Sequence, residues 1–171
     1  PAPGTVNTGG EVTIGLPEVT VSAGAPVTEG DPGDANQLSF TVSLDRTSSE
    51  DVTVEFTAAG GTATEGTDFA GGTQTVTIPA GQTSAEVLVD ITGDLNVEDD
   101  ETVVGSIAAP SGAVLGGTTS ATATIVDDDL PIISIGDTSV VEGDAGDSRQ
   151  LVYTIQLTDP ANPGAPFNAL E

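Results

Sequence analysis

The sequence predicts an all-β protein, built as an antiparallel β-sandwich. Three observations support this prediction. Apolar and polar residues alternate over several short windows, Gly-rich turns separate those windows, and no window of helical length has apolar residues spaced three and four positions apart. The apolar residues are mostly Val, Ala, Leu and Ile, and β-branched side chains pack well on a pleated sheet.

The predicted strands follow one another between residues 51 and 126. The apolar residues that share one face of a strand are, in chain order, Val52, Val54 and Phe56; Val76 and Ile78; Val87, Val89 and Ile91; and Ala121, Ala123 and Ile125. Glycines at 60–61, 71–72, 81, 112 and 116–117 mark the turns between them. Short strands at this spacing are typical of a sandwich or a barrel.

Large side chains are scarce, since the chain has no Trp, Met or Cys, one Tyr and four Phe. We expect the aromatic residues Phe40, Phe56, Phe69 and Tyr153 to fill the core between the sheets. A chain of 171 residues is long enough to bury such a core without disulfides. The alternation of apolar residues argues against disorder, although the net charge is high.

An internal repeat divides the chain. Residues 29–44 and 142–157 are 113 positions apart and identical at nine of sixteen positions, and the Leu-Pro pairs at 16–17 and 130–131 extend the match with one residue of slippage. Such self-similarity indicates a tandem array. We therefore expect one complete domain over residues 16–129 and the N-terminal part of a second repeat over 130–171. Residues 1–15 are interpreted as the tail of a preceding repeat or a linker.

The charge excludes several classes of function. There are 27 acidic residues against two basic ones, Arg46 and Arg149, and the net charge of −25 repels nucleic acids and anionic lipid surfaces. No run of apolar residues is long enough to span a membrane. With no His and no Cys, the commonest general base and the thiol nucleophile are missing, and three percent aromatics makes a sugar-binding carboxylate hydrolase a poor fit. We therefore expect that the protein is not an enzyme.

Two acidic clusters each follow a predicted strand and hold eight of the acidic residues. Residues 93–101 read GDLNVEDDE, and residues 127–129 are three consecutive Asp. Crowded carboxylates without basic partners repel one another, and a calcium ion, with its six to eight oxygen ligands, relieves that repulsion. The alternative is a solvated acidic surface with no ion. Magnesium fits less well because it keeps several waters, and an EF-hand is not supported because the ligand pattern fails at Asp99 and Gly105.

Several motifs in a fixed order connect the chain to a family. Residues 28–31 read TEGD, 51–69 read DVTVEFTAAGGTATEGTDF, 75–102 read TVTIPAGQTSAEVLVDITGDLNVEDDET, and 122–129 read TATIVDDD. This series resembles the Calx-beta repeat over nearly all of 16–129, and again from 130 to about 159. The resemblance implies an immunoglobulin-like sandwich of about seven strands. The family occurs in sodium–calcium exchangers, in integrin beta-4 and in long secreted or surface proteins of bacteria.

The resemblance also implies a Ca²⁺ site formed by loops at one end of the sandwich. The residues that match the family's ligand motifs are Glu29, Asp68, Asp94, Glu98, Glu101, Asp127, Asp128 and Asp129. We expect Gly66 to permit a tight turn beside this site. In one place the chain departs from the family, because Gly93 stands where the acidic loop often begins with a second Asp. That departure implies fewer ions or weaker binding.

These observations predict a calcium-binding structural repeat of a large, adhesin-like secreted or cell-surface protein, of bacterial type, in which calcium rigidifies domain ends and junctions. Two alternatives remain open, a calcium-sensing regulatory module and a calcium-free spacer. The expected partners are neighbouring repeats of the same chain, together with self-association through the partial second repeat. No nucleic acid and no membrane insertion are expected.

Overall fold

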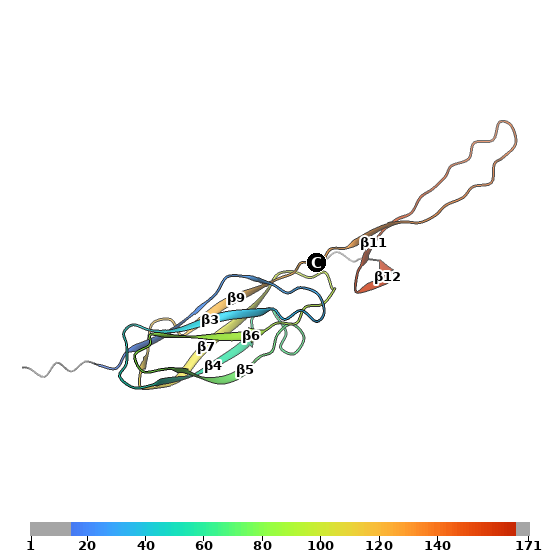
Figure 1. Cartoon of the computed structure of the whole chain (residues 1–171). Coiled ribbons are helices and arrows are strands. Elements are labelled where there is room, and N and C mark those ends of the chain that lie inside the picture. The colour runs from blue at the N-terminus through green and yellow to red at the C-terminus, as the bar shows by residue number, and fades with distance from the viewer. Residues whose placement is uncertain (1–14, 167–171) are drawn as a thin grey trace, which may run out of the picture.

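The computed structural model describes residues 15–166 and confirms the predicted all-β class, because every regular element among these residues is a strand. Figure 1 shows two facing sheets followed by a projecting hairpin. The strands are β1 Glu18–Ala23, β2 Val27–Thr28, β3 Gln37–Leu44, β4 Val52–Gly60, β5 Gly72–Ile78, β6 Ser84–Asp90, β7 Glu101–Ser111, β8 Val114–Leu115, β9 Ser120–Val126, β10 Ile132–Ile135, β11 Ile155–Asp159 and β12 Asn162–Pro166.

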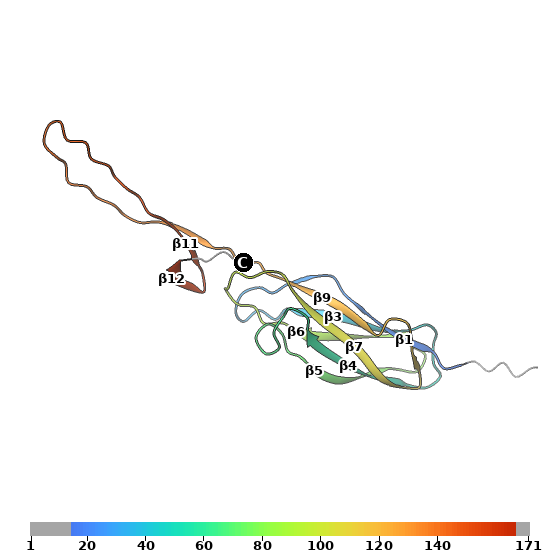
Figure 2. The same ribbon diagram turned by 180° about the vertical axis from the view of Figure 1, so that it is seen from behind.

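Strands β1 to β9 form the sandwich. One sheet has the order β6-β3-β1-β8 and the other β2-β9-β7-β4-β5. Neighbouring strands are antiparallel, apart from the two-residue strands β2 and β8, which pair parallel with β9 and β1. The remaining seven strands have six or more residues, so the prediction of an antiparallel sandwich of about seven strands is confirmed. Figure 2 shows the two layers from behind.

The core lies between the sheets and is built from the residues that alternate along each strand. In β3, for example, every second residue from Leu38 to Leu44 is buried. Phe40 and Phe56 meet across the two layers with ring centroids 5.2 Å apart and ring planes at 55°. Gly105 of β7 lies against them, and a Cβ at this position would approach the Phe40 ring to 2.6 Å. The expected roles of Phe40, Phe56 and Phe69 in the core are confirmed.

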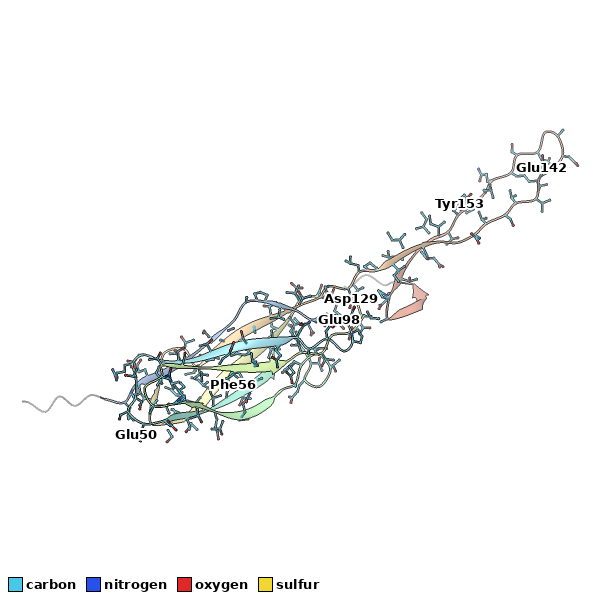
Figure 3. All side chains as sticks on the ribbon, in the orientation of Figure 1. Glu50, Phe56, Glu98, Asp129, Glu142 and Tyr153 are labelled. Atoms are coloured by element: carbon cyan, nitrogen blue, oxygen red, sulfur yellow. The ribbon has the colours of Figure 1, made fainter. Side chains whose placement is uncertain are left out.

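Strands β10, β11 and β12 form a separate three-stranded sheet beyond the sandwich. The prediction that Tyr153 fills a core is wrong, because its side chain is 61% exposed. The reason is that no second layer covers this sheet within the described part of the chain, and Figure 3 shows Tyr153 on the projecting hairpin. The prediction made for residues 1–15 falls, apart from Gly15, outside the described residues.

Over residues 15–166, no helix has the length and apolar character needed to cross a membrane.

Candidate metal centre

Acidic side chains converge at the end of the sandwich from which the hairpin leaves. Figure 3 places Glu98 and Asp129 at this end and Glu50 at the opposite end. The acidic end is formed where β2 and β9 finish, where β7 begins, and where the chain connects β4 to β5 and β6 to β7. Carboxylates from segments that are distant in sequence therefore lie close together at this end of the sandwich.

Glu29 is positioned by the short parallel pairing of β2 with β9. Thr28 pairs with Val126, and the Glu29 amide donates to the Val126 carbonyl at 3.0 Å. This pairing sets Glu29 beside Asp127, which directly follows β9. The side chain of Asn36 donates to the Glu29 carbonyl at 2.8 Å and holds the segment from the other side. Glu29 is consequently 5% exposed, which is unusual for a carboxylate without a basic partner.

Asp68 lies on a tight turn that the core anchors. Its Oδ2 accepts a hydrogen bond from the Thr64 amide at 2.6 Å, and its carbonyl accepts one from the Thr92 amide at 2.8 Å. Phe69, next along the chain, is 1% exposed and packs in the core. Gly66 has φ of +85°, a left-handed conformation that confirms the tight turn expected there. The core thus fixes a carboxylate that is itself 8% exposed.

The loop after β6 carries Asp94 and Glu98. Asp94 Oδ1 accepts from the Asn96 amide at 2.6 Å, and Oδ2 accepts from the Asn96 side chain at 2.7 Å, so the loop folds around this carboxylate. Gly93 is buried against the backbone of the Glu29 segment, and a Cβ at Gly93 would overlap the carbonyl oxygen of Gly30. This close backbone contact gives a physical reason for glycine here in place of a second Asp.

Six of the eight predicted ligands form two triads. In each triad, one carboxylate oxygen from each of the three residues lies within 4.8 Å of the other two. The first triad consists of Glu29, Asp94 and Asp129, and the second consists of Asp68, Glu98 and Glu101. The first triad joins residues from three separate segments of the chain, whereas the second joins Asp68 to Glu98 and Glu101 of the 93–101 cluster. Oxygens at this spacing can share one cation as ligands.

The other two predicted residues lie beside the triads. Asp127 lines a small cavity together with Glu29, Glu98 and Glu101, and its Oδ1 is buried without a hydrogen-bond partner. Asp128 is exposed, and its Oδ1 accepts from the Gly30 amide at 3.2 Å.

Further carboxylates at this end were not among the predicted ligands, and two of them interact with predicted ligands. Asp100 Oδ1 accepts from the Asp127 amide at 3.3 Å, and the charge of Asp31 acts on Asp129. Both are part of motifs that the sequence displays, the acidic loop and the TEGD segment. Spacing alone does not tell which acids of such a run point inward.

The electrostatics of the site oppose ionisation. Burial raises the pKa of Glu29 from 4.5 to about 8, and repulsion from Asp94 and Asp127 adds to the shift. Burial and the neighbouring Asp68 carboxyl raise the pKa of Glu101 to about 7. The pKa values of Glu98 and Asp129 are raised as well, first by burial and then by the surrounding carboxylates.

The donor set fits a hard divalent cation. Three carboxylate oxygens are buried without a hydrogen-bond partner, namely Glu29 Oε1, Asp127 Oδ1 and Asp129 Oδ2. Arginine does not neutralise them, because within residues 15–166 Arg46 pairs with Asp45 and Arg149 with Asp147. Oxygen-only ligands from flexible acidic loops are the type that calcium takes, whereas magnesium retains more of its own waters.

A sequence profile of the Calx-beta domain matches residues 27–129. The chain belongs to the Calx-beta domain family. This confirms the resemblance noted from the motifs, and the family is one of calcium-binding regulatory and structural domains, not of enzymes. The matched residues contain all eight predicted ligands and end on Asp129.

Solved Calx-beta structures share the fold. The apo form of the Calx CBD1 domain is 24% identical and superposes with a TM-score of 0.56, covering 67% of this chain and all of that domain. CBD12 from CALX1.2 is 25% identical with a TM-score of 0.57, covering 70% of this chain and 49% of that one, so the match spans about half of the larger protein. The calcium binding domain CBD12 of CALX1.1 is also 25% identical, with a TM-score of 0.53.

Proposed function

We propose that this chain is a calcium-binding structural repeat whose ions hold together the end of the sandwich and its junction with the next segment. The observation that supports this best is the burial of Glu29, whose Oε1 has no hydrogen-bond partner and whose neighbours are other carboxylates. An uncompensated buried charge is costly, and a cation offsets that cost.

Each triad would bind its own ion. Glu29, Asp94 and Asp129 would hold one ion, and Asp68, Glu98 and Glu101 would hold another, with Asp127 available between them. Bound calcium supplies positive charge to a site that has no basic side chain. Because Glu29 and Glu101 have raised pKa values, binding near neutral pH releases protons from them.

The first triad also reaches the junction. Asp129 is followed by Leu130 and Pro131, and β10 begins at Ile132, so no Gly/Ser linker separates the sandwich from the hairpin. Pro131 further restricts Leu130 to extended backbone. An ion held by Asp129 would therefore fix the last residues before the hairpin, and its removal would leave like charges repelling at the joint.

Thermal unfolding with and without calcium tests the binding. At a calcium concentration 100-fold above Kd, we expect the free energy of unfolding to rise by about 2.7 kcal/mol for each bound ion, relative to the protein in chelator. Asp129→Asn should remove much of this gain and the exposed Asp128→Asn less, while Glu50→Gln at the opposite end should leave it unchanged. Equal midpoints with calcium and with chelator would refute calcium binding.

Small-angle scattering tests the junction. We expect the full chain to show a smaller range of maximum dimensions, and less flexibility, in calcium than in chelator. Matching scattering curves under both conditions, in a protein that binds calcium by calorimetry, would leave the ion without a role at the junction.

A regulatory role is the second candidate, because the Calx-beta family includes regulatory as well as structural calcium-binding domains. Affinity separates the two, because sensors bind calcium at about 10⁻⁷–10⁻⁵ M and extracellular modules at about 10⁻⁴–10⁻³ M. We propose the weaker range, in keeping with a secreted or cell-surface adhesin-like protein of bacterial type. Calorimetric titration decides between these ranges.

A further inference from the structure

The hairpin formed by β10 and β11 repeats the pairing of β1 with β3. In the sandwich, Val19 pairs with Leu44 and Val21 with Val42. In the hairpin, the corresponding pairs are Ile133 with Leu157 and Ile135 with Ile155. The positions correspond through offsets of 114 for the first strand and 113 for the second, which match the slippage of the sequence repeat. The strand register is therefore conserved between the two copies.

The turn between the two strands is repeated as well. The Asp34 amide donates to the Asp31 carbonyl at 3.0 Å, and the Asp147 amide donates to the Asp144 carbonyl at 3.0 Å. Gly33 and its counterpart, residue 146, both have φ of +102°. The segment is thus a structural copy of the β1–β3 unit, although it lies outside the sandwich.

The apolar face of this copy is uncovered. Phe40 of β3 is 0% exposed, whereas Tyr153 at the same place in the hairpin is 61% exposed. The same contrast separates Val19 and Val21, which are buried, from Ile133 and Ile135, which are exposed. The remaining exposed members of this face are Leu151, Ile155 and Leu157. A contiguous apolar face of this kind marks a binding surface.

The sandwich shows what covers the equivalent face. Phe40 packs against Phe56 of β4 and Gly105 of β7, and β3 and β1 both face β9. The outer edge of β3 is paired with β6 over seven residues, from Gln37–Asp90 to Ser43–Ser84. On the corresponding edge of β11, the described chain offers only β12, which pairs at Thr158 and Asp159. The hairpin therefore lacks both a facing sheet and most of an edge strand.

We propose that the face of the hairpin binds the complementary sheet of a Calx-beta sandwich, a partner that presents strands of the β4, β7 and β9 type and adds a strand of the β6 type to the open edge. Residues 130–158 are then the first unit of a second sandwich, in which Tyr153 takes the place that Phe40 has in the first. The proposal rests on backbone register and apolar faces, and it is independent of calcium.

The test provides the complementary sheet by adding a second copy of the strands that form it in the first sandwich. A second copy of residues 46–129 is fused after Thr158, which corresponds to Asp45, so that the added strands have no β1–β3 unit except the hairpin. Tyr153 is the one tyrosine of the chain, there is no Trp, and the added residues contain neither, so its fluorescence reports on this face alone. The measurement is quenching of that fluorescence by acrylamide.

We expect the quenching constant of Tyr153 to fall several-fold in the fusion relative to the 171-residue chain. Ile155→Asp, on the apolar face, should restore quenching in the fusion, whereas Gln156→Asp, on the opposite face, should not. In the original chain both positions are exposed, so neither variant should shift the melting of the first sandwich.

A second arm guards against a fusion that fails to fold for other reasons. Residues 18–44 of the sandwich are replaced by residues 132–157, and we expect cooperative thermal unfolding to persist. Loss of that cooperativity would overturn the proposal, as would a Tyr153 in the fusion that is as accessible as before. A third outcome would also overturn the proposal. If Tyr153 in the original chain becomes less accessible as concentration rises, and sedimentation shows a dimer, then a second copy of the chain covers this face.

Discussion

Replacing Glu29 by Gln should have opposite effects on stability with and without calcium. Glu29 is 5% exposed and lies among Asp94 and Asp127, so its charge opposes folding unless a cation is present. Glutamine has nearly the same shape, carries no charge and offers one amide oxygen. The substitution should therefore stabilise the metal-free protein by removing charge repulsion. It should also reduce the stability that the protein gains from bound calcium.

The size of the first effect follows from the pKa of Glu29, which is about 8 in the folded protein against an ordinary value of 4.5. A group with a raised folded pKa contributes stability below pH 4.5 and loses it as pH rises toward 8. At pH 7 the loss covers 7 − 4.5 = 2.5 pH units, or at most about 3 kcal/mol at 1.36 kcal/mol per unit. Glutamine does not titrate, so Glu29→Gln should regain up to this amount in chelator, roughly 10 °C in midpoint.

In calcium the same variant loses a carboxylate ligand of the first triad. The gain in midpoint on adding calcium should therefore be clearly smaller than in the unsubstituted protein. Thermal unfolding at pH 7, in chelator and in saturating calcium, measures both effects. Glu50→Gln is the matched control, because Glu50 is an exposed carboxylate at the other end of the sandwich (Figure 3).

Two results would refute this reasoning. A lower midpoint of Glu29→Gln in chelator would mean that the buried carboxylate is not a source of repulsion in the metal-free protein. An unchanged calcium increment would mean that Glu29 is not a ligand.

The remaining predictions concern pH, proton release and the glycine beside the site. In chelator, the melting midpoint should fall between pH 5 and pH 8, because Glu29 and Glu101 have pKa values raised to about 8 and about 7, and saturating calcium should remove the fall; a flat profile in chelator would contradict the raised values. Calorimetry at pH 7 in buffers of different ionisation enthalpy should detect protons released on calcium binding, and identical heats would exclude such release. Gly93→Ala should lower both the midpoint and the calcium affinity, because its Cβ would overlap the Gly30 carbonyl, whereas Gly117→Ala, with no atom near its Cβ, should change neither.

The fold class and the positions of β4, β5, β6 and β9 follow from the sequence alone, whereas β1, β3 and β7 were not among the predicted strands. Alternation such as Val52, Val54 and Phe56 records which face of a strand is buried, and this information is local, because successive side chains point to opposite sides. The motifs also determined the family and the eight candidate ligands, since residues 28–129 carry them in order. The motifs alone therefore predicted which residues are the candidate ligands.

The grouping of the acidic residues depends on tertiary contacts. Glu29, Asp94 and Asp129 come together because β2 pairs with β9 and because the loop after β6 packs against the β2 segment, contacts between residues far apart in the chain. Burial likewise depends on what covers a residue, as the pair of Phe40 and Tyr153 shows. The two residues correspond in the sequence repeat, and β11, which follows Tyr153, has the register of β3. Phe40 is nevertheless buried and Tyr153 exposed, because a facing sheet is present in one case and absent, among the described residues, in the other.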